Sequence, residues 1–502
     1  MVGLFLWMGF QALQYNLYKY TSLGFSGEFC YYAEMATSLP DAILSEIYNF
    51  NPFGQNVFGY AGYEGTENFY QSVHFEPIKF IYALLYGLTG RFSALFLFLS
   101  LAYFSPLLYL ALVVPLKDRS RQVMALLWAV IYALYPPVME VASFDLRPRG
   151  LLGPALALLL ITVLYRRPLW EKALALLFLF AVREEAILLA PFLILIDWLS
   201  TAPRKARRNS LAVLSAVWLL GTITALWFFE WGGFARSGKI AQVLAGNPGW
   251  AAAALVVGAG FLGWIVWIYR TRGSDPAVCR RLQLIAWLPI LGLVGGGGLL
   301  AYFNAYETLS LAGLMKYLNA EFLYTARLSV LFAGLWGAVG LVWEGLRAKG
   351  RKITNYVFLG LVLLSAVGTV VISPRIKANF GKNIDRVLVP EHTAEVWDLR
   401  AQTDPYSTEV LWDYNTMTAF CDYEHSYGLE RSPYFLVGDT DGLNYPENLE
   451  TLKMLLTDQV EVIVIHRANQ EIVEGLLAEL SITPRKVQVS EYGGRYLIYW
   501  IQ

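Results

Sequence analysis

Cysteine and charge are both scarce in this sequence. The chain has three cysteines, Cys30, Cys279 and Cys421, which give neither a metal-type spacing nor a disulfide framework. Asp, Glu, Lys and Arg make up only 16% of the 502 residues, and they balance to a formal net charge of zero. This is not the composition of a soluble protein, and the balanced charge gives no reason to expect nucleic acid as a partner.

Apolar sequence is abundant instead. Hydrophobic residues make up 56% of the chain, and the mean hydropathy is +0.45. Many separate apolar runs come close to the ~20 residues that a helix needs to cross a bilayer. These runs cover 2–18, 77–116 with a break at Gly90-Arg91, 123–138, 151–165, 173–199, 211–229, 250–269, 282–303, 323–343 and 356–372. We therefore predict an α-helical polytopic membrane domain over 1–372, with about 10–12 membrane helices that include short hairpin arms.

The composition changes after Pro374, where the hydropathy drops and stays low. STEVLWDYN, VEVIVIHR and GRYLIYWIQ are rich in β-branched and aromatic residues, which is typical of strands. NLETLKMLLTD and NQEIVEGLLAELSI have the apolar spacing of helices. The alternation predicts a small soluble α/β domain over 373–502.

The positions of Lys and Arg predict the topology. Basic clusters occur at 117–121, 166–172, 204–208, 270–281 and 347–352, and we expect all five to be cytoplasmic. The first apolar run has no basic region and no small-residue cleavage site, so we expect a retained helix rather than a removed signal peptide. Residues 19–76, with one lysine and seven acids, are then the first outer loop. We therefore expect the domain 373–502 to lie on the outer, non-cytoplasmic side of the membrane.

Three charges interrupt the run 173–199, in the stretch FLFAVREEAILL. The flanking clusters at 166–172 and 204–208 both favour the cytoplasm, so the segment between them must enter the membrane and return. We predict two helices, about 173–182 and 186–199, with Arg183, Glu184 and Glu185 at the tip of a hairpin in a protein-lined cavity. The alternative is one long tilted helix whose charges pair with neighbouring helices.

Three motifs resemble a known family. HFEPI at 74–78 resembles H-F-S-P-I, YALYPPVMEVASFDLRPRG at 132–150 resembles Y-L-L-Y-P-P-x-x-x-x-x-x-F-D-F-H-P, and VREEAIL at 182–188 resembles K-E-D-x-A-L. Together they resemble a bacterial multi-pass membrane protein family of unknown function. The resemblance implies a place in the bacterial inner (cytoplasmic) membrane, with the domain 373–502 on the periplasmic side. That family is similar to the GT-C glycosyltransferases, which use polyprenyl-phosphate sugars. Two positions depart from the pattern: FSGEFCYYAEMA at 25–36 stands in place of F-D-L-G-I-F-D-Q, and Arg147 replaces a histidine.

The resemblance implies roles for several outer residues. Catalytic acids are expected among Glu28, Glu34 and Asp145; phosphate-binding cations among Lys79, Arg147, Arg149 and Arg183; and supporting groups among His74, Glu76, Glu184 and Glu185. Each also has a purely structural interpretation. Glu28 and Glu34 could be solvated loop acids, and Asp145 could form a salt bridge with a loop arginine. Lys79 could snorkel toward water, and the charges at 183–185 could lock helices together. His74 and Glu76 could share a divalent metal with Glu28 or Asp145, and the metal requirement stays open.

Two functions are therefore compared. The first is a GT-C-type integral-membrane glycosyltransferase that moves a sugar from a polyprenyl-phosphate donor on the outer face. The second is a GT-C-like relative that has lost catalysis and serves as a structural or assembly subunit of a larger membrane complex. Membrane lipids are partners in both cases, with the lipid-linked sugar as partner of the enzyme and other proteins as partners of the subunit. A transporter ranks last, because the polar groups gather at the outer face rather than along a path through the membrane.

Overall fold

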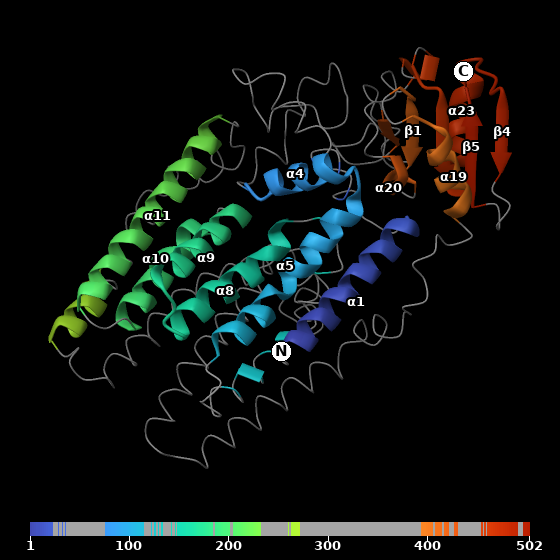
Figure 1. Ribbon diagram of the computed structural model, residues 1–502. Helices are drawn as coiled ribbons and strands as arrows, with labels where there is room; N and C mark the ends of the chain where they lie inside the picture. The colour runs from blue at the N-terminus through green and yellow to red at the C-terminus, as the bar shows by residue number, and fades with distance from the viewer. Residues whose placement is uncertain are drawn as a thin grey trace, which may run out of the picture.

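The computed structural model describes residues 1–23, 76–114, 148–183, 186–200, 204–231, 263–271, 393–404, 407–413, 416–420, 426–429, 459–489 and 495–501, with isolated residues between these ranges. These parts form two bodies, a helical part and a small α/β tail domain (Figure 1). The predicted crossings between 282 and 372 lie outside the described residues.

The helical part is a bundle of long helices that lie side by side, with one short helix across one end (Figure 1). Its elements are α1 (Val2–Thr21), α4 (Lys79–Thr89), α5 (Phe92–Val113), η1 (Pro148–Leu151), α8 (Leu152–Leu164), α9 (Leu169–Val182), α10 (Ala186–Ser200) and α11 (Arg204–Trp231). The predicted break in the run 77–116 is confirmed, because α4 ends at Gly90 in the left-handed conformation (φ 63°). α4 has 11 residues, about 16 Å at ~1.5 Å per residue, so this run contains a single helix of crossing length, α5.

α1 and α5 pack antiparallel. The Tyr20 ring near the end of α1 lies 5.8 Å from that of Phe92 and 5.7 Å from that of Phe96, at the start of α5. Half-way along, a Cβ on Gly9 would lie 3.8 Å from the carbonyl oxygen of Ser100. This distance is an ordinary van der Waals contact, so α1 lies directly against α5 at this position.

The two helices of the predicted hairpin and the break at Arg183 are confirmed, and the single tilted helix is wrong; the protein-lined cavity at the tip stays a prediction. α9 ends at Val182, Arg183 has an extended backbone (φ −170°, ψ 154°), and α10 begins at Ala186. Lys172, near the start of α9, lies 2.6 Å from Asp197, near the end of α10, so the two helices are antiparallel. Their 14 and 15 residues span about 21 and 22 Å, less than the ~30 Å hydrocarbon core of a bilayer.

α11 runs back along α10. Ser210 donates a hydrogen bond to Asp197, and Trp218 Nε1 donates to the Ile187 carbonyl at 3.0 Å. Gly221 brings α11 against α9, because a Cβ there would lie 2.7 Å from the Phe180 ring. The three helices α9, α10 and α11 therefore form one packed unit.

Apolar side chains are widely exposed on the helical part. The most exposed are Leu88 at 75%, Leu112 at 73%, Trp170 at 63%, and Leu220 and Trp267 at 62%. Such surface fits a bilayer rather than water. Within the described residues, Phe92–Val113 is the helix long and apolar enough to cross a membrane, and shorter apolar helices cover Leu152–Val163 and Leu189–Leu199.

The tail domain is a five-stranded sheet with helices on both faces. Its elements are α19 (Ala394–Gln402), β1 (Val410–Asp413), α20 (Met417–Phe420), β2 (Ser426–Leu429), β3 (Val462–His466), η3 (Arg467–Asn469), α23 (Gln470–Glu479), β4 (Lys486–Val489) and β5 (Tyr496–Trp500). The order is β2-β1-β3-β5-β4, with β1 parallel to β2 and β3, and with β5 antiparallel to β3 and β4. The three predicted strands and the predicted helix α23 are confirmed; β2 and β4 were not predicted.

The alternation of side chains along the central strands explains the two helix layers. Leu411 of β1 and Ile463 of β3 belong to the core that includes Val473 and Leu477 of α23. Their neighbours Trp412 and Val464 face the other core, with Val396 and Leu399 of α19. Since both faces are covered, these strands are apolar throughout, as expected of buried parallel strands.

The tail domain contacts the end of α1. Thr393 Oγ1 and Trp397 Nε1 each donate a hydrogen bond of 2.8 Å to the Thr21 carbonyl, and the Trp397 ring lies 4.8 Å from the Tyr20 ring. In Figure 1 the tail domain lies near this end of α1, at the end of the bundle that α4 crosses. We call this end, with Thr21, α4 and the hairpin tip, the tip end. The predicted topology requires the tail domain and the hairpin tip to lie on the same side of the membrane. That this is the outer side stays a prediction.

Candidate functional site

Glu76, Lys79 and Arg183 form a buried charged cluster at the tip end, called here the tip cluster. Glu76 precedes Pro77, and the Lys79 amide donates to the Glu76 carbonyl at 3.0 Å as α4 begins. Because Glu76 and Lys79 are three residues apart in the sequence, this turn brings their side chains to the same side of the chain. Lys79 Nζ lies 3.0 Å from Glu76 Oε2, and the two side chains are 2% and 1% exposed.

Arg183 reaches the cluster from the hairpin tip. Its Nη1 lies 3.7 Å from Glu76 Oε1, and its side chain is 3% exposed. The Ile78 amide donates to the Ala181 carbonyl at 2.8 Å, so the start of α4 and the end of α9 are also joined by their backbones. Two cations from separate elements therefore meet one carboxylate in a fixed arrangement.

The tip cluster places two cations and one carboxylate close together. Two cations surround one carboxylate in a region that water does not reach, where electrostatic interactions are stronger than at a surface. Lys and Arg donate hydrogen bonds to carboxylate and phosphate oxygens alike. The arrangement is therefore chemically suited to hold an anionic oxygen.

Tyr82 extends this site by one helical turn. Its side chain is fully buried, and it lies near enough to Glu76 for the two groups to interact electrostatically. The described part of the chain gives the Tyr82 hydroxyl no hydrogen-bond partner. A buried hydroxyl without a partner costs about 1–3 kcal/mol. The sequence analysis missed this residue, although its spacing from Lys79 on one helix face was a usable signal.

The structure brings together three of the residues expected to form the site. Lys79 was expected either to bind phosphate or to snorkel toward water; burial beside Glu76 shows that snorkelling is wrong. Arg183 was expected to bind phosphate or to pair with an acid such as Asp145, and it pairs with Glu76. Arg149 lies in η1, where its backbone alone is described. Glu28, Glu34, His74, Asp145, Arg147, Glu184 and Glu185 lie outside the described residues.

The same limit applies to a metal. Over the described ranges, the chain brings together no group of three or more His, Cys, Asp or Glu side chains that could hold a metal ion. His74, Glu28 and Asp145, which the sequence offered as ligands together with Glu76, are outside those ranges. The tip cluster itself presents one carboxylate and two cations, a donor set that suits an anion rather than a metal ion.

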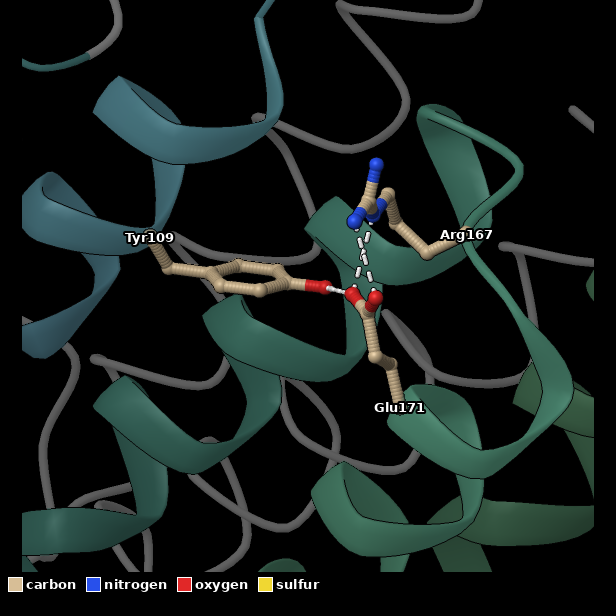
Figure 2. A network of polar contacts seen from close by, with 3 residues as sticks. All are labelled: Tyr109, Arg167 and Glu171. Atoms are coloured by element: carbon tan, nitrogen blue, oxygen red, sulfur yellow. Dashed lines mark hydrogen bonds and ion pairs between the residues drawn. The ribbon is translucent and has the colours of Figure 1, made fainter.

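Polar networks at the opposite end of the bundle involve Arg167 and Lys172, two members of the basic cluster 166–172. Figure 2 shows Tyr109 of α5 and Arg167 pointing at the Glu171 carboxylate. Arg167 donates to it from Nε at 2.9 Å and from Nη2 at 2.8 Å, and the Tyr109 hydroxyl donates to Oε2. Because both carboxylate oxygens have donors, this network ties α5 to the start of α9 and leaves little capacity for a ligand.

A second network joins three helices. Asp197 accepts hydrogen bonds from Lys172 and Ser210, and all three side chains are buried. Lys172 belongs to the basic cluster 166–172, and the structure shows that it is an internal partner; the side of the membrane on which it lies stays a prediction. The carboxylate has a donor on each oxygen, so this network stabilises the hairpin rather than forming a binding site.

The tail domain has one buried acid at the carboxyl end of its parallel strands. Asp413 accepts hydrogen bonds from the His466 amide at 2.7 Å, from Asn469 Nδ2 at 2.8 Å, and from Thr416. Burial raises the pKa of the Asp413 carboxyl. These donors all come from the domain itself, so Asp413 holds the ends of β1 and β3 together.

The chain matches no known protein family, and no curated protein matches it. Among solved structures it is similar to the "Crystal Structure of ArnT from Cupriavidus metallidurans bound to Undecaprenyl phosphate", with a TM-score of 0.43 and 12% identity over 99% of this chain and 97% of that chain. It is also similar to ArnT from the same organism in the apo state, with a TM-score of 0.42 and 13% identity over 95% and 93% of the two chains. Similarity at this level does not establish a function for the chain. The resemblance of its three motifs to a family stays a prediction.

Proposed function

We propose that this chain is a membrane protein that binds a polyprenyl-phosphate sugar at the tip end and transfers the sugar, as a GT-C-type glycosyltransferase does. One observation carries the proposal: Lys79 and Arg183, from separate elements, converge in a buried site at one end of the bundle. Buried cations in a membrane domain are costly, and they commonly mark a site of function. A lipid phosphate beside apolar helices is an anion that fits this place.

The chemistry assigns distinct tasks to cations and acids. In the transfer, the bond between the sugar's anomeric carbon and the phosphate oxygen breaks, and a bond to the acceptor oxygen forms. The departing polyprenyl phosphate gains negative charge, which Lys79 and Arg183 would stabilise because they are positioned before the reaction. The acceptor hydroxyl gives its proton to a carboxylate, for which Glu28, Glu34 and Asp145 are the candidates.

A second function has its own support. A catalytically inactive relative that serves as an assembly subunit needs no free anion site, and Glu76 already lies between both cations. The substitution of Glu28 and Glu34 for the aspartates of the resembled motif agrees with lost catalysis. In this case the tip cluster would serve only to fix α4 against the hairpin.

A transfer assay distinguishes the two functions. The purified full chain is incubated with a labelled polyprenyl-phosphate sugar and a membrane extract as acceptor, beside the variants Glu28→Gln, Glu34→Gln and Asp145→Asn. The enzyme predicts transfer by the wild type and a loss of about 10²–10⁴-fold in at least one variant. Glu479→Gln, which changes an exposed acid of the tail domain, is the control and should keep full activity. Absence of transfer by the wild type from every donor, or full activity in all three variants, favours the subunit.

A further inference from the structure

We propose that Glu76 competes with the lipid phosphate for Lys79 and Arg183, so that its carboxylate must give way when phosphate binds. This inference rests on the function proposed above. It assigns to Glu76 a task other than catalysis: tuning how tightly the site holds each form of the lipid. The argument starts from the positions of the three side chains.

The two contacts of Glu76 are unequal. Lys79 Nζ forms a close ion pair with Oε2 at 3.0 Å, whereas Arg183 Nη1 is 3.7 Å from Oε1, beyond the ~2.7–3.2 Å of a normal N–H···O bond. The Arg183–Glu76 contact is therefore electrostatic and is more easily exchanged for another anion. Since the Ile78 amide and the Ala181 carbonyl are bonded at 2.8 Å, α4 and the hairpin remain joined when the carboxylate moves.

A phosphate can replace the carboxylate chemically. Lys and the guanidinium fork of Arg bind either group with charge-assisted hydrogen bonds, and a phosphate offers more acceptor oxygens. The two forms of the lipid differ in charge: the sugar-linked donor is a phosphodiester with one negative charge, and the released lipid is a monoester with about −1.5 to −2 at pH 7. A carboxylate left nearby repels the monoester more strongly than the diester.

This difference gives Glu76 a consequence for turnover. Repulsion weakens the binding of the released polyprenyl phosphate more than that of the donor, so the carboxylate favours product release. If Glu76 has only a structural role, its mutation should have the opposite effect on lipid binding. If its task is to lock α4 against the hairpin, neutralising it loosens both cations and weakens the binding of both lipids.

The test measures lipid affinity of the full chain in nanodiscs of zwitterionic lipid. A short-chain polyprenyl monophosphate and its sugar-linked diester are titrated into the wild type, Glu76→Gln and Glu76→Asp, with Lys79→Gln to identify binding at the tip cluster. We expect Glu76→Gln to bind the monoester on the order of tenfold more tightly and the diester only about threefold more tightly. Glu479→Gln, an exposed acid of the tail domain, should leave both affinities unchanged.

The outcomes distinguish failure of the competition from failure of the proposed function. If the wild type binds in a Lys79-dependent manner but Glu76→Gln binds the monoester no more tightly, the competition is overturned and the proposed function stands. If neither form shows Lys79-dependent binding, the proposed function fails and the competition with it. Glu76→Asp keeps the charge but shortens the side chain, so it serves if Glu76→Gln does not fold. The monoester should bind to it more tightly than to the wild type, and equal or weaker binding contradicts the proposal.

Discussion

Lys172 Nζ lies 2.6 Å from Asp197 Oδ1, and this buried pair joins the start of α9 to the end of α10. Removing one member leaves the other charge buried without its partner, which typically costs about 3–5 kcal/mol. Lys172→Met should therefore lower the free energy of unfolding by about that amount, measured by denaturant titration in detergent. Lys205→Met, at an exposed position on α11, is the control and should have little effect. A loss of under about 1 kcal/mol for Lys172→Met contradicts the buried pair.

The contact between the tail domain and α1 depends on two donors that share one acceptor. Trp397→Phe keeps most of the ring against Tyr20 but removes one hydrogen bond to the Thr21 carbonyl. In this variant, hydrogen exchange of the α19 amides should become faster by a factor that corresponds to about 0.5–1.5 kcal/mol. The double variant Trp397→Phe/Thr393→Val should exchange faster still. Unchanged exchange in the double variant means that this contact does not hold the tail domain.

Asp413 makes the stability of the tail domain depend on pH. Burial raises its pKa in the folded state, so the folded domain holds this proton more tightly than the unfolded chain. The resulting stabilisation is fully present below the unfolded pKa of about 3.9, and it is lost as the pH rises through the higher folded pKa. Asp413→Asn should remove this contribution and flatten the pH profile of amide exchange in β3 and α23.

The same variant should also destabilise the domain at neutral pH. An asparagine amide would turn a donor toward the donors of His466 and Asn469, and one unsatisfied buried group costs about 1–3 kcal/mol. Asp398→Asn, at an exposed position on α19, is the matched control. If the two variants have the same pH profile, Asp413 is not the source of the dependence.

Topology can be read by cysteine labelling on intact cells. In a chain without Cys30, Cys279 and Cys421, Glu479→Cys in the tail domain should react with an impermeant reagent added from outside. Arg208→Cys, at the other end of the bundle, should react only after lysis. The reverse pattern would show that the tail domain is cytoplasmic and that the basic clusters were assigned to the wrong side.

Local signals predicted the breaks in the helical part. Gly90 marked the end of α4, and the charges at Arg183, between two basic loops, marked the hairpin tip. In the tail domain, the β-branched runs of β1, β3 and β5 were strong enough to be recognised. β2 (SYGL) and β4 (KVQV) were not, because each is four residues long and weakly apolar.

Partners distant in the sequence could not be predicted. Asp197 lies 25 positions from Lys172, and Tyr109 lies 62 positions from Glu171, so only the folded bundle reveals that these charges are internal. Similarly, the sequence placed Glu76 near Lys79 but left the partner of Arg183 open. Its identification required the antiparallel packing that brings the hairpin tip to the start of α4.

The most direct test of the central claim is photo-crosslinking with a polyprenyl phosphate that carries a photoreactive group near the phosphate. The full chain is labelled in nanodiscs, and the modified peptides are identified by mass spectrometry. The account predicts labelling of peptides that contain Lys79 and Arg183, competition by unlabelled polyprenyl phosphate, and loss of labelling in Lys79→Gln and Arg183→Gln but not in Lys205→Gln. Labelling that is spread over the bundle and unaffected by Lys79→Gln and Arg183→Gln would contradict the account, because the lipid phosphate would then not be held by the tip cluster.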